Sequence, residues 1–105
     1  MSTIESVRID KFLWSVRLFK TRSLAAEACK KDRVTIGGMP VKTSRVIKPG
    51  DVIGIRVPPI IRSFKVLALA DNRMGAKLVP GYIEDVTPAE VLEVLELSLL
   101  SQADG

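Results

Sequence analysis

The side chains in this sequence that are suited to binding a partner are the cations Lys and Arg and the hydroxyls of Ser and Thr in its first half. Lys and Arg outnumber Asp and Glu by 12 to 5 in residues 1–56, a net charge of +7, and are outnumbered by 7 to 4 in residues 57–105, a net charge of −3. Ammonium and guanidinium groups clustered on a folded unit can neutralise several phosphates at once. The asymmetry predicts a polyanion as partner and disfavours a surface that serves solubility alone.

The candidate contacts to this partner share either a positive charge or a small hydroxyl. Cations attract phosphates, and Ser and Thr hydroxyls can bind phosphate or 2′-hydroxyl oxygens. The candidate set is Arg8, Lys11, Arg17, Lys20, Thr21, Arg22, Ser23, Lys30, Lys31, Lys42, Ser44 and Arg45. Arg8 could equally brace the start of a helix, and Thr21 could serve only as a helix cap.

Catalysis and metal binding are disfavoured by what the composition lacks. There is no His, which removes the commonest general base and a common zinc ligand. The single cysteine, Cys29, falls at an apolar helix position and is expected to fill the core. The acidic residues after position 80 lie on a predicted loop and helix face, and none pairs into a catalytic dyad. We therefore expect no enzyme, no metal and no cofactor.

The hydrophobic pattern and the cysteine content indicate the cellular compartment of the chain. No apolar run approaches the ~20 residues of a membrane-spanning helix, and residues 1–7 lack the hydrophobic stretch of a secretory signal. One cysteine allows no internal disulfide. We expect a cytoplasmic protein without a membrane partner.

Two amphipathic helices are predicted to position most of the cations. The first spans about Asp10 to Lys20, with Asp10 as N-cap, Ile9 and Trp14 as a hydrophobic staple and an apolar stripe that includes Phe12. The second spans about Arg22 to Lys31, with Thr21 as N-cap. It should bury Leu24, Ala25, Ala28 and Cys29 and end near Asp32 in the left-handed conformation.

Strands are predicted to follow these helices. Gly37-Gly38 supplies the positive φ angles of a tight turn between strands at 34–36 and 40–42. A further strand is predicted at 52–57, and another within residues 60–70. Thr87 and Pro88 then predict the start of a helix that runs to about Ser101.

The predicted C-terminal helix is apolar over more than one stripe, so it must dock on something. We favour packing on its own body over binding a partner. Trp14 and Leu18 are expected to pack beneath this C-terminal segment. The fold class is α+β: two helices on a small, mainly antiparallel sheet, with an added strand and a C-terminal helix. Residues 1–59 form the basic module and residues 60–105 an extension packed on it.

Several motifs support this interpretation through a resemblance. RIDKFLWSVRLFKTRSLA, VTIGGMPVK and VIKPGDVI, in that order, resemble the S-four-type RNA-binding domain, also called the alpha-L motif, over residues 8–57. DKFLW together with VLALADNRMGA resembles the ribosome-associated heat-shock protein fifteen family. Asp32 stands where the S-four-type family usually has Gly, and Gly37 where it usually has Asn, and both residues can keep the required backbone.

The resemblance implies non-catalytic binding of structured RNA, namely ribosomal RNA of the large subunit, with transfer RNA on stalled subunits as a further partner. Two alternatives stay open. One is a protein-interaction adaptor that uses the acidic, Leu-rich C-terminal helix. The other is a stand-alone guide module for an RNA-modifying enzyme.

Overall fold

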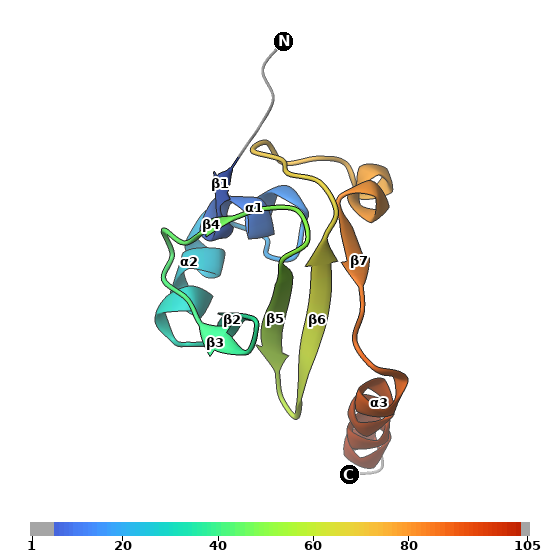
Figure 1. Ribbon diagram of the computed structural model, residues 1–105. Helices are drawn as coiled ribbons and strands as arrows, with labels where there is room; N and C mark the ends of the chain where they lie inside the picture. Colours follow the sequence, from blue (N-terminus) through green and yellow to red (C-terminus); the bar gives the residue numbers. More distant parts are fainter. Residues whose placement is uncertain (1–5, 104–105) are drawn as a thin grey trace.

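The computed structural model describes residues 6–103 and shows an α+β fold, as predicted (Figure 1). Its elements are β1 (Val7–Arg8), α1 (Ile9–Ser15), α2 (Arg22–Lys30), β2 (Val34–Ile36), β3 (Met39–Pro40), β4 (Val46–Ile47), β5 (Val52–Val57), β6 (Ile60–Val66), a 3-10 helix η1 (Ala76–Gly81), β7 (Ile83–Asp85) and α3 (Ala89–Ala103).

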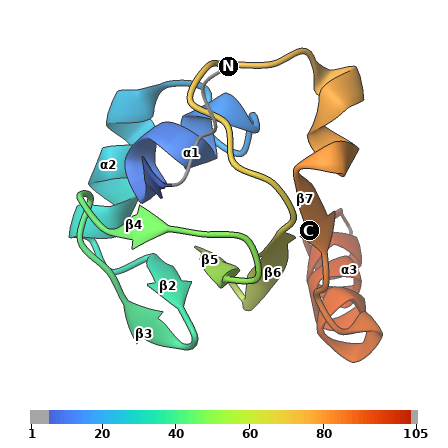
Figure 2. The same ribbon diagram turned by 45° about the horizontal axis from the view of Figure 1, so that its top comes forward.

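Five strands form an antiparallel sheet in the order β3-β2-β5-β6-β7. Strands β1 and β4 pair separately, with Val7 opposite Ile47. Both views show α1 and α2 together at the β2 side of the sheet, while α3 lies apart, beyond β7 (Figures 1 and 2). The basic helices and the acidic helix are therefore at opposite ends of the molecule.

The glycine turn predicted between the first strands is confirmed. Gly37 and Gly38 have φ angles of 61° and 84°, and Ile36 pairs directly with Met39 across them. Two consecutive residues with positive φ give a turn whose twist matches that of the strands. The predicted strand at 52–57 is β5, with the same bounds.

One hydrophobic core joins the two halves of the chain. Phe12 and Leu13 of α1 are fully buried and belong to the same cluster as Phe64, Val66 and Ile83. The division proposed after residue 59 falls in the turn between β5 and β6, which pair from Val57↔Ile60 to Val52↔Lys65. Strand β6 thus belongs to the core on which the helices pack.

The first helix differs from its prediction at both ends. It begins at Ile9 with Arg8 as N-cap, and that cap makes no side-chain hydrogen bond, so Asp10 is not the cap and Ile9 and Trp14 are not the staple pair. It ends at Ser15 and not at Lys20, and Arg17 takes a φ of 65°. Arg73 Nη1 donates to Trp14 O and Met74 N donates to Ser15 O, so residues remote in sequence take the carbonyls at the helix end.

The second helix follows its prediction closely. Thr21 Oγ1 accepts from Leu24 N at 3.1 Å, which confirms the N-cap, and Asp32 has the left-handed φ of 58°. Ala25, Ala28 and Cys29 are buried, but Leu24 is 46% exposed, so its predicted burial is wrong. Leu24 sits in the first turn of α2, beside the cap.

The C-terminal helix is present, but Thr87 does not cap it. The Thr87 hydroxyl accepts from Ser63 N at 2.9 Å and donates to Ser63 O, so it ties the segment before α3 to β6. Beyond this tie, Val94, Leu97, Leu99 and Leu100 are 48–65% exposed. Packing of the whole helix on its own body, which we favoured, is therefore not what the structure shows. Of the helices described, none has the length and apolarity needed to cross a membrane.

Candidate nucleic-acid interface

Asp10 organises the cations at the start of the basic face. Its side chain is only 5% exposed, and it pairs with Arg8 Nε at 3.2 Å and with Arg22 Nε at 3.4 Å. Asp10 Oδ1 also accepts from Lys11 N at 2.9 Å in the first turn of α1. One nearly buried carboxylate therefore fixes a guanidinium from the start of each helix, and both arginine side chains stay about half exposed.

The 41–45 loop brings a second group of cations to the end of α2. Val41 N donates to Val34 O, Arg45 N donates to Lys42 O at 3.0 Å, and Ile9 N donates to Arg45 O at 2.8 Å. These bonds hold the loop between β2 and the start of α1. Arg45 is thereby placed directly before the β4 residue that pairs with Arg8.

A pocket of about 480 Å³ lies where this loop meets α2, and we call it the α2–loop pocket. Its lining includes Cys29, Lys30, Asp32, Val41, Lys42 and Ser44. A smaller hollow beside it shares Val41, Lys42 and Ser44 and adds Arg45. The structure thus brings together four predicted contacts, Lys30, Lys42, Ser44 and Arg45, from separate parts of the sequence.

Three of these cations are available for a partner. The ion pairs formed within residues 6–103 are Arg8–Asp10, Arg22–Asp10, Lys31–Glu27 and Arg62–Asp85. Lys30, Lys42 and Arg45 take part in none of them, and all three are exposed. An exposed cation that forms no ion pair can contact a phosphate without first breaking one.

Other predicted contacts have additional or different neighbours. Arg17 Nη1 donates to Met74 O at 3.3 Å, on the side where the C-terminal half packs. Lys31 Nζ lies 2.8 Å from Glu27 Oε1, and its hydrogen bond and charge lower the pKa of that carboxyl. Thr21 caps α2, while Ser23 and Lys20 are exposed near that cap and Lys11 is half-buried in α1.

Two polar residues that line the α2–loop pocket, Asp32 and Thr43, are not among the contacts predicted from the sequence. The sequence predicts Asp32 only as the end of the second helix, and it gives no role to Thr43, which lies between the candidates Lys42 and Ser44. The position of Thr43 within a run of polar candidates was the available signal. For Asp32 the sequence carried none, because its approach to the loop depends on the tertiary fold.

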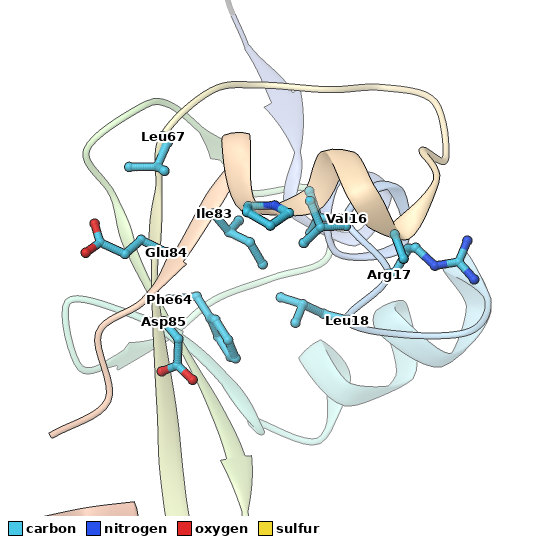
Figure 3. A pocket seen from close by; sticks show the side chains of 11 residues that line it. Val16, Arg17, Leu18, Phe64, Leu67, Ile83, Glu84 and Asp85 are labelled. Carbon is cyan, nitrogen blue, oxygen red and sulfur yellow. The ribbon is translucent and has the colours of Figure 1, made fainter. Parts of the chain in front are cut away.

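A cavity of about 790 Å³ forms an apolar groove away from these cations. Figure 3 shows Leu18, Phe64, Ile83 and Val16 directed toward its interior, with Arg17, Glu84 and Asp85 farther out. Leu18 packs against the core here, which confirms its predicted packing beneath the C-terminal half. Burial and hydrogen bonds act on the Asp85 carboxyl in opposite senses, and bonds from Thr87 and Arg62 leave its pKa lowered.

The single thiol is not placed for nucleophilic chemistry. Cys29 is 2% exposed, and burial raises the pKa of its thiol from 9.0 to about 11. This confirms it as a core residue, since a reactive cysteine needs a stabilised thiolate. Among the residues that the structure describes, no three His, Cys, Asp or Glu side chains are grouped to hold a metal ion.

Comparisons with known proteins agree with this architecture. The family model of the S4 domain matches residues 7–53. A Heat shock protein 15 homolog of Haemophilus influenzae is 33% identical over 69% of this chain and 55% of its own length. The RQC P-site tRNA stabilizing factor of Bacillus subtilis is 38% identical over 63% of this chain and 77% of its own length.

A solved structure, described as the trimeric structure of Vibrio cholerae Heat Shock Protein 15, superposes with a TM-score of 0.80. The match has 27% identity and covers 96% of this chain and 100% of that one. The chain spans 55% of the length of the Haemophilus relative. From the domain match and these relatives, the chain belongs to the S4 domain family, in the group that includes Heat shock protein 15 homologs and RQC P-site tRNA stabilizing factors.

Proposed function

We propose that this protein binds structured RNA without catalysis. The observation that carries the proposal is the convergence of Lys30, Lys42 and Arg45, which form no ion pair among the described residues, beside the Asp10-bound Arg8 and Arg22. A rigid face with charges at fixed positions can match the phosphate spacing of a folded RNA.

The RNA we propose is ribosomal RNA of the large subunit, with transfer RNA on stalled subunits as a further partner in the cytoplasm. The relatives support this proposal through their names, which refer to heat shock, to a P-site tRNA and to the factor that stabilizes it. Family membership favours RNA over DNA, whereas charge alone does not distinguish them.

The test compares cations on and off this face. Lys30→Ala combined with Lys42→Ala should weaken binding to large-subunit RNA at least tenfold at fixed salt, because each lost phosphate contact removes released counterions. Lys77→Ala, which removes an exposed cation of η1, is the matched control and should leave affinity within about twofold. Equal losses in both variants would contradict the assignment of this face.

The exposed apolar surface of α3 favours a second candidate, a protein-interaction adaptor. Leu97 and Leu100 are 65% and 58% exposed, and Glu90, Glu93 and Glu96 are exposed on the same helix. Charge reversal of these three glutamates to Lys should abolish partner association under the adaptor hypothesis. Under the RNA-binding proposal, it should leave RNA affinity equal or higher. A guide module for a separate RNA-modifying enzyme would instead co-purify with that enzyme.

A further inference from the structure

The α2–loop pocket combines charge with an apolar floor. Cys29 and Val41, which are 2% and 8% exposed, line it together with the exposed residues Lys30, Lys42 and Ser44. Its volume of about 480 Å³ falls within the ~300–1,000 Å³ typical of small-ligand sites. A phosphate needs only charge and donors at a surface, so the apolar lining residues indicate that a flatter, less polar group also enters.

Asp32 is the unexpected member of this pocket. It lines the pocket together with Lys30 and Lys42, and it forms no ion pair or side-chain hydrogen bond with any residue in the range 6–103. The left-handed φ of 58° suits Gly better than Asp, so the backbone alone does not call for this side chain. A carboxylate here repels phosphates, which opposes the binding that the neighbouring cations favour.

The Asp32 carboxylate would favour RNA binding, despite this repulsion, if it accepts hydrogen bonds from the RNA. Phosphates and carbonyl oxygens cannot donate, whereas bases carry N–H donors on their edges. Guanine presents two adjacent donors, N1–H and N2–H, which match the two oxygens of a carboxylate. In a duplex these donors are used in pairing, so only an unpaired guanine can present them.

We propose that the α2–loop pocket holds the base of an unpaired guanine. Asp32 accepts from its Watson–Crick edge, Cys29 and Val41 support the ring, and Lys30 and Lys42 bind the adjoining phosphates. This inference rests on the proposed RNA binding and adds the class of nucleotide that the site selects. It explains why a carboxylate lines a pocket that also contains Lys30 and Lys42.

The experiment measures affinity of the full chain for RNA hairpins that differ in one bulged nucleotide. The set carries a bulged G, A, C or U, or no bulge, at one salt concentration. The wild-type chain should bind the bulged-G hairpin about tenfold more tightly than the unbulged one, as expected for one bidentate contact to a base. No preference, or a preference for another base, overturns the assignment to guanine.

Asp32→Gly gives the sharper comparison. If Asp32 accepts hydrogen bonds from guanine, this change lowers the affinity for bulged G; if Asp32 only repels phosphates, the change raises that affinity. Gly keeps the left-handed backbone, which a melting curve verifies. Affinity for bulged G should fall about tenfold, while affinity for the unbulged hairpin should rise slightly as repulsion is removed. The control, Glu27→Gln, also removes a negative charge from the cationic helix and should affect every hairpin alike.

The outcomes separate this inference from the function on which it rests. If Asp32→Gly strengthens binding to all hairpins equally, Asp32 is only a repulsive charge and the guanine site is refuted while RNA binding stands. If the wild-type chain binds none of the hairpins with a steep dependence on salt, the proposed function itself fails.

Discussion

Asp10 Oδ2 lies 3.4 Å from Arg22 Nε, and this contact joins the first turn of α1 to the first turn of α2. The Asp10 side chain is nearly buried, whereas the Arg22 side chain is 45% exposed. Arg22 can therefore remain paired while part of its guanidinium faces a partner. A residue predicted to contact RNA is thus also a structural link between the helices.

Asp10→Ala should lower the free energy of unfolding by about 1–3 kcal/mol, since it removes an acceptor used by Arg8, Arg22 and Lys11 N in a nearly buried position. Urea denaturation measures the change. Arg8→Gln is the control and should cost less than about 1 kcal/mol, because that side chain is half exposed. Equal effects from both variants would show that Asp10 does not organise the junction.

Gly54 should tolerate no side chain, because of its neighbour across the β2–β5 pair. A Cβ at Gly54 would lie 2.5 Å from Thr35 Oγ1 and 3.1 Å from Ile61 Cγ2. Gly54→Ala should destabilise the fold by about 1–3 kcal/mol through overpacking, and adding Thr35→Ala should recover part of that loss. Thermal unfolding of the single and double variants measures this coupling.

Gly37→Ala provides a contrast to Gly54→Ala. A Cβ at Gly37 meets no atom within 4 Å, but its φ of +61° lies in the left-handed region, where an alanine is strained. The expected cost is about 1–2 kcal/mol, and Thr35→Ala should not recover it. Recovery in this background would indicate that Thr35→Ala stabilises the protein for another reason.

Cys29 should resist alkylation in the folded protein. Burial raises the pKa of its thiol from 9.0 to about 11, which lowers the thiolate fraction at pH 8 by about 100-fold. Mass spectrometry after iodoacetamide treatment at pH 8 should find the thiol largely unmodified, with rapid modification in urea. Reaction at the same rate in both states would contradict its burial.

The elements that the sequence predicts well are those set by neighbouring residues. The Thr21 cap lies three residues before the amide it binds, and the Gly37-Gly38 turn needs only its own positive φ angles. Both are determined by side chains and backbone within a few residues of each other. Local chemistry therefore suffices for α2 and the β2–β3 hairpin.

Features that depend on distant residues could not be predicted in this way. The end of α1 is set by Arg73, which donates to both Trp14 O and Phe19 O from more than fifty positions away in sequence. Likewise Thr87 has the spacing of a cap, yet Ser63 of β6 takes its hydroxyl. The α2–loop pocket has the same origin, since Asp32 and Lys42 meet only when the sheet forms.

The most direct test of the RNA-binding proposal is the salt dependence of affinity for large-subunit RNA. If about four to six phosphates are neutralised, a plot of log K against log salt should have a slope of roughly −3 to −5. Lys30→Ala should flatten that slope by about one unit, as expected for one phosphate contact. A slope near zero for the wild-type chain would contradict the account.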